Sequence, residues 1–111
     1  MNTSAVISLI PYGKQATKPV RNNAMALRLA DLRIWFSYAT PVAFRVKDEP
    51  RPTVRQNDWG PTTGKHLNAI DGGEAKAKEQ RVESRAFERS LRFNIERTAL
   101  RVLGDSRDAF I

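Results

Sequence analysis

The sequence predicts an α+β domain, in which one short and one long C-terminal helix pack on one face of a small antiparallel sheet of three to five strands. Three observations indicate this class. Apolar residues alternate with small or polar ones over residues 25–46, which is the period of strands. A Pro-Thr-Thr-Gly segment at 61–64 has the composition of a helix start, and Gly-Gly at 72–73 that of a helix end. Apolar residues then recur every three to four positions over residues 85–103, which is the period of a helix.

The strand region divides into several expected strands. The alternation changes parity at Ala30-Asp31, which indicates a turn between two strands or a bulge. Residues 42–46 alternate again and predict a further strand, followed by a proline-rich loop over residues 48–52. Residues 53–56 predict a short strand at the sheet edge. Trp35 has the opposite parity to its apolar neighbours, so we expect it on the other face, under the long helix or in a binding surface.

Two helices follow. The first is expected over Gly64 to Ile70, with a threonine as N-cap and a left-handed glycine end. Residues 74–80 are a helical turn or an exposed linker. The long helix is expected over Arg85 to Leu103, between a Ser84 N-cap and a stop at Gly104. Its buried face is expected to comprise Phe87, Leu91, Ile95, Thr98 and Val102.

These elements predict one small domain. We expect an N-terminal arm over residues 1–23, a domain over 24–104 and a tail over 105–111. The apolar start of the arm is expected to add an edge strand or to tuck into the core.

Composition excludes several classes of protein. The chain has 111 residues, 41% of them hydrophobic, and no cysteine, so it has neither disulfides nor thiolate metal sites. Its apolar runs are shorter than the roughly 18–20 residues of a membrane span, and a basic segment before the apolar N-terminal stretch is missing. We therefore expect a cytoplasmic protein without a membrane segment, a signal peptide, a metal or another cofactor.

The chain is strongly basic, with 19 lysines and arginines against 12 acidic residues and a net charge of +7. Such a charge favours nucleic acid or acidic proteins as partners, although a soluble protein without such partners can also be basic. Arg85, Arg89 and Arg92 follow one another at helical spacing, with Arg81 before them, and arginine binds phosphate oxygens through two parallel bonds. Glu88 and Glu96 are each four residues from Arg92, and pairing with them would instead make this a solvated, salt-bridged face.

A dense polar motif around Trp59 is the second candidate site. Its members are Asn57, Trp59, Thr62, Thr63, His66 and Asn68. His66 is the only histidine and would be the simplest general base, but the favoured interpretation is that His66 and Asn68 hydrogen-bond to the turn backbone beside Trp59. Gly60 to Lys65 departs from the phosphate-loop spacing by one residue, which argues against nucleotide hydrolysis. Lys65 and the threonines could still hold one anion at the helix start, with simple N-capping as the alternative.

Two runs carry a family resemblance. F-S-Y-A-T-P-V-A-F at 36–44 and V-R-Q-N-D-W-G-P-T-T-G-K-H-L-N at 54–68 resemble a family of small proteins encoded by phages and prophages, whose function is unknown. The resemblance covers residues 24–73 and extends weakly into 85–91. It implies a phage or prophage origin, and hence the host cytoplasm, but no reaction.

The expected function is that of a non-enzymatic, phage-type accessory protein that binds a macromolecule. Nucleic acid is the expected partner, contacted by Lys65, Arg85, Arg89 and Arg92. The alternative is an inhibitor or adaptor that binds an acidic host or phage protein. A small enzyme that uses His66 is the third and least favoured hypothesis.

Overall fold

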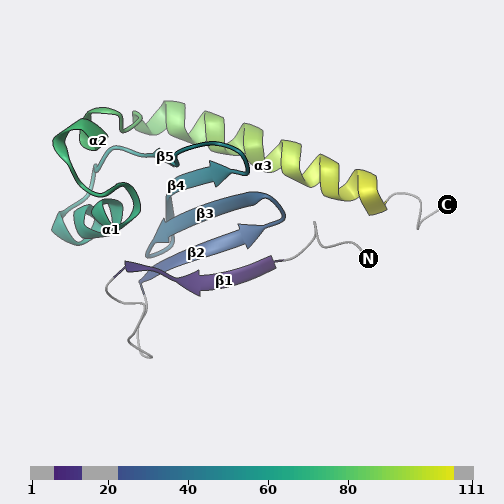
Figure 1. Ribbon diagram of the computed structural model, residues 1–111, viewed down its shortest axis with the longest axis horizontal. Helices are drawn as coiled ribbons and strands as arrows, with labels where there is room; N and C mark the ends of the chain where they lie inside the picture. Colours follow the sequence, from purple (N-terminus) through teal and green to yellow (C-terminus); the bar gives the residue numbers. More distant parts are fainter. Residues whose placement is uncertain (1–6, 14–22, 107–111) are drawn as a thin grey trace.

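The computed structural model describes residues 7–13 and 23–106 and contains five strands and three helices. The strands form one antiparallel sheet in the order β1-β2-β3-β4-β5, and the long helix α3 runs along it (Figure 1). The predicted α+β class is therefore confirmed. The element bounds are β1 Ile7–Pro11, β2 Ala24–Leu29, β3 Leu32–Ser37, β4 Thr40–Val46, β5 Thr53–Val54, α1 Pro61–Asp71, α2 Ala75–Glu79 and α3 Ser84–Ser106.

The parity change at Ala30-Asp31 is a turn. It joins β2 to β3, which pair from Leu29↔Leu32 to Ala24↔Ser37, and Ala30 has a φ of 54°. The segment expected to be an arm contributes β1, which pairs with β2 as an edge strand. Residues 1–6, 14–22 and 107–111, which include the rest of that arm and most of the expected tail, lie outside the described residues.

A bulge interrupts the pairing of β3 with β4. Trp35 pairs with Ala43 and Phe36 with Pro41, so Val42 is an extra residue without a partner in β3. Val42 and Ala43 are both fully buried, although neighbouring strand residues point to opposite faces. The sheet is therefore covered on both sides at this end of β4.

Helix α3 forms the main core with β3 and β4. Phe87 and Leu91 pack against Leu32, Ile34 and Phe44. The rings of Phe44 and Phe87 lie 5.6 Å apart between centroids. The predicted inner face of the long helix is confirmed at these two helix positions and at the buried Thr98.

The same helix departs from the prediction in two places. Ile95 is 37% exposed, because it lies at the border of the arc that contains Leu91 and Thr98. The expected stop at Gly104 is wrong, since α3 continues to Ser106. Glycine inside a helix costs only about 1 kcal/mol relative to alanine, so Gly104 alone does not end one.

Helix α1 builds a second, smaller core at one end of the sheet (Figure 1). Its Leu67 is fully buried against Val42, Ala43 and Val54. Trp35 packs against this cluster and is half-buried, so its opposite parity places it beside α1 rather than under α3.

Of the two ends predicted for α1, the C-terminal end is confirmed and the N-terminal cap is not. The expected threonine N-cap is wrong, since the helix begins earlier, at Pro61, and Gly60 is its N-cap without a side-chain bond. Proline needs no N–H partner at the first helical position, which explains this start. The predicted end is confirmed, because Gly72 has a left-handed φ of 90° and its N–H donates to the Asn68 carbonyl. Of the helices in the described part of the chain, none has the length and apolarity of a membrane span.

Candidate functional site

The polar motif begins with a turn that Asn57 holds together. Asn57 Oδ1 accepts the Trp59 backbone N–H at 3.0 Å, and Asn57 Nδ2 donates to the Gly60 carbonyl at 3.1 Å. An asparagine that bonds backbone two and three residues ahead stabilises a turn locally. Asn57 is thus explained by the chain reversal that delivers Pro61 to the start of α1.

The buried part of the motif attaches α1 to the sheet. Ser37, at the end of β3, places its Oγ 2.7 Å from His66 Nδ1 and 3.0 Å from Thr63 Oγ1. The rings of Tyr12 and Tyr38 flank His66 with centroids 6.1 and 6.0 Å away. Burial lowers the pKa of His66, because the charged imidazolium loses its hydration. It also raises the pKa of the Tyr12 phenol, which donates to the Phe36 carbonyl at 2.8 Å.

A serine hydroxyl against an imidazole is the arrangement of a nucleophile and its base. Here Ser37 is only 3% exposed and His66 only 6%, so a substrate does not reach the hydroxyl in this structure. Every buried side-chain nitrogen or oxygen among the described residues has a hydrogen-bond partner. These bonds join the end of β3 to α1, and Ser37, which we did not predict, is at their centre. The available signal was a serine on the Trp35 face of an otherwise apolar strand end.

Two other motif residues lie on the surface of α1. Thr62 is exposed, and Asn68 is exposed but accepts from Arg81 at 3.0 Å. Arg81 also binds Asp71 through two bonds, at 2.8 and 3.0 Å. Burial alone would raise the pKa of Asp71, but bonds from Arg81 and from the Gly73 N–H hold it below its usual value. Arg81 is thus committed to this ion pair and does not belong to the arginine row of the long helix.

Trp59 and His66 have different neighbours, contrary to the expectation that they support one turn. Trp59 is 47% exposed and its ring centroid lies 4.9 Å from the guanidinium of Arg55, whereas His66 faces Ser37. Arg55 is a buried arginine that our sequence reasoning missed. Its only signal in the sequence was its place next to Val54 in the strand expected over residues 53–56.

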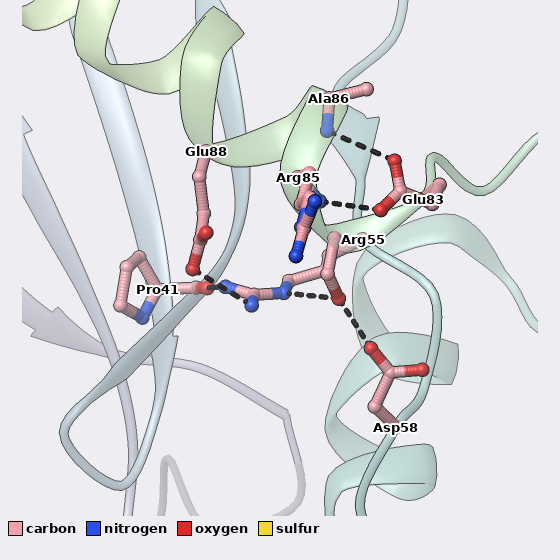
Figure 2. Close-up of polar contacts among 8 residues, drawn as sticks. Pro41, Arg55, Asp58, Glu83, Arg85, Ala86 and Glu88 are labelled. Atoms are coloured by element: carbon pink, nitrogen blue, oxygen red, sulfur yellow. Dashed lines mark hydrogen bonds and ion pairs between the residues drawn. The ribbon is translucent and has the colours of Figure 1, made fainter.

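Arg55 joins three segments of the chain, as Figure 2 shows. Its Nε donates to Ser84 Oγ at 3.1 Å, one NH2 group to the Pro41 carbonyl at 3.4 Å and the other to Glu88 at 3.0 Å. The guanidinium also lies 5.5 Å from the Phe87 ring centroid. The Arg55 side chain thus connects the end of β5 to β4 and to the first turns of α3.

The first turn of α3 is capped differently from our prediction. Glu83, not Ser84, accepts the backbone N–H groups of Arg85 and Ala86, at 2.8 and 3.2 Å (Figure 2). These two bonds lower the pKa of the Glu83 carboxyl, and the nearby charges of Arg89 and Arg85 lower it further. Ser84 instead donates to the Asp58 carboxylate, which fixes the loop before α1 against α3.

Three of the four predicted binding residues meet in one place. Arg85, Arg89 and Arg92 line a shallow hollow on α3 of about 240 Å³, together with Glu88. Among the ion pairs of the described residues, none involves these arginines, and Glu88 pairs with Arg55. The fourth predicted residue, Lys65, is exposed on α1 and does not line this hollow.

Comparison with known proteins yields one family. The model of a family of unknown function, DUF8033, matches residues 7–88, which is most of the chain. No curated protein and no solved structure matches.

Proposed function

The chain belongs to the family of unknown function DUF8033, and we propose that it is a non-enzymatic accessory protein that binds nucleic acid through a basic surface. One observation carries this proposal. Arg85, Arg89 and Arg92 line one hollow on α3, and none of the ion pairs of the described residues involves them, although Arg85 and Arg89 are close enough to the Glu83 carboxylate to lower its pKa.

The main objection was that acidic residues of the same helix would neutralise this row. Glu88 does lie within it, but its Oε2 is 3.0 Å from Arg55, on the side that faces the sheet end. Guanidinium groups without acidic partners suit phosphate oxygens, because each can donate two parallel, charge-assisted bonds. Lys65, at the start of α1, is proposed as a peripheral phosphate contact.

The test is the salt dependence of binding to a short DNA duplex, followed by fluorescence anisotropy. Four phosphate contacts give a slope of log affinity against log salt of about −3.6. Arg89→Gln with Arg92→Gln should weaken binding to all duplex sequences alike and flatten that slope by about 2. Lys76→Gln with Lys78→Gln is the matched control, since it removes two exposed charges from α2. Equal effects of the two double variants, or no binding by the wild type at 150 mM salt, would refute the proposal.

A second candidate function, an adaptor that binds a protein, is favoured by a different observation. Phe93, Leu100 and Leu103 on α3 are all more than 60% exposed. Exposed apolar side chains that share one helix are more typical of a protein interface than of a phosphate site. A pull-down that survives nuclease treatment, and that Phe93→Ser with Leu100→Ser abolishes, would favour this candidate over nucleic acid.

A phage or prophage origin and a place in the host cytoplasm complete the proposal. They are supported by the runs at residues 36–44 and 54–68, on which the family resemblance was noted. Genomic neighbourhoods of family members test the origin directly: genes for virion or lysogeny proteins should flank them.

A further inference from the structure

We infer that the sheet carries a second phosphate-binding surface, suited to one strand of nucleic acid and separate from the hollow on α3. The surface is the row of Arg28, Arg33 and Arg45, called here the sheet arginine row. The inference takes the class of its ligand, nucleic acid, from the proposed function, but it concerns different residues.

The row is set by strand register. Arg28 of β2 pairs with Arg33 of β3, and Arg33 pairs with Arg45 of β4. Directly paired residues project from the same face, so three arginine side chains project from one face of three neighbouring strands. All three arginines are exposed. Like charges in direct opposition destabilise a sheet, so the fold alone does not favour this arrangement.

No carboxylate of the described residues neutralises the row. The ion pairs among the described residues involve Arg55, Arg81 and Arg101 and none of the three arginines of the row. The nearby Asp31 is bound by Arg101 at 2.7 Å. Arg45 donates from Nε to the Glu49 backbone carbonyl, which leaves its positive charge uncompensated. Arg33 lies 5.7 Å from the Trp35 ring centroid, a cation–π contact that orients the guanidinium without neutralising it.

The three arginines line one cavity of about 500 Å³ at the end of the sheet, beside the turn at Ala30 and the last turns of α3. Lys47 and Arg101 line it as well, so five cations surround it, with Asp31 as the one acidic residue. This excess of positive charge fits a ligand with several negative charges.

The size of the row fits a single strand. Neighbouring strands lie about 4.8 Å apart, so the three arginines span roughly 10 Å. Phosphates follow one another every 3.4 Å or so along one strand of nucleic acid, which places about three of them over that span. A cavity of about 500 Å³ is smaller than three whole nucleotides, so the phosphates of such a segment would lie in it and the bases outside it. Single strands commonly bind sheet faces in this manner, with bases stacked on aromatic rings or arginine planes.

The test compares a single-stranded oligonucleotide with its duplex in salt titrations. Arg28→Gln with Arg45→Gln removes the outer charges and keeps Arg33 on Trp35. We expect weaker single-strand binding and a salt slope flatter by about 1.4, with a much smaller change for the duplex. The melting temperature should stay equal or rise, because opposed charges are removed. Lys76→Gln with Lys78→Gln serves as the matched control, with no selective effect on the single strand.

Failure of this inference differs from failure of the proposed function. If the sheet variant binds the single strand as the wild type does, or loses single strand and duplex equally, the single-strand surface is refuted. Loss of duplex binding in the Arg89→Gln/Arg92→Gln variant would then leave the proposed function standing. If the wild type binds neither ligand, both are refuted.

Discussion

Replacement of Arg55 by methionine tests the junction between β5, β4 and α3. Methionine keeps most of the apolar stem, so the change removes polar contacts without opening a large cavity. The lost bond to Ser84 and the Pro41 carbonyl left without its donor cost about 1 kcal/mol each. The lost contacts with the rings of Trp59 and Phe87 add about 1 kcal/mol.

The ion pair with Glu88 contributes less than its 3.0 Å distance suggests. The Glu88 side chain is 61% exposed, so water screens the pair and solvates the carboxylate once Arg55 is gone. We therefore expect Arg55→Met to lower the free energy of unfolding by about 3 kcal/mol. Glu88→Gln, the matched control, should lower it by less than about 1 kcal/mol.

Urea denaturation followed by tryptophan fluorescence measures both variants, and Trp59 reports directly on the junction. A loss below about 1 kcal/mol for Arg55→Met, or an equal loss for Glu88→Gln, would refute this account of the junction.

The Arg55→Met variant also has a consequence for nucleic-acid binding. A Glu88 released from Arg55 can pair with Arg92 one turn later, so Arg55→Met should also weaken duplex binding.

Three further changes test other parts of the structure. Phe44→Ala should lower the free energy of unfolding by roughly 3–5 kcal/mol, as for other buried aromatics, and a loss below about 1 kcal/mol would contradict the core packing. Because burial lowers the pKa of His66 from 6.5, the unfolded chain takes up the proton first. Stability should therefore fall as pH drops from about 6.5 through the folded pKa, and His66→Gln should remove this component while retaining nucleic-acid binding. Gly73→Ala should destabilise clearly in thermal melts, because its Cβ would lie 2.7 Å from the Asn68 side chain at a φ of 71°; an unchanged melting temperature would contradict this.

Much of the fold could be predicted because it depends on local periodicity. Alternation placed β2 to β4, and helical spacing placed Phe87 and Leu91 in the core. The glycine pair ended α1, since few other residues adopt a left-handed conformation readily. The errors occurred where a local signal is weak: a threonine near a helix start need not be its cap, and Gly104 is tolerated inside α3.

The candidate sites were predictable only in part. Arg85, Arg89 and Arg92 meet on the surface because one helix carries them, and helical spacing is visible in the sequence. The roles of Ser37, Arg55 and the sheet arginine row were not visible, since each depends on residues brought together from distant parts of the chain. Strand register decides which charges stand opposite one another, and no single strand contains that information.

The sequence by itself determined the class of the fold, the basic charge and the arginines of the long helix, because composition and period are properties of one segment. Only the tertiary structure decided which of these charges are neutralised. Arg55 pairs with Glu88, Arg81 with Asp71 and Arg101 with Asp31, and the partners of each ion pair are at least ten residues apart in sequence. The physical reason is that an ion pair needs contact within about 4 Å, and the folding of distant segments against one another creates that contact.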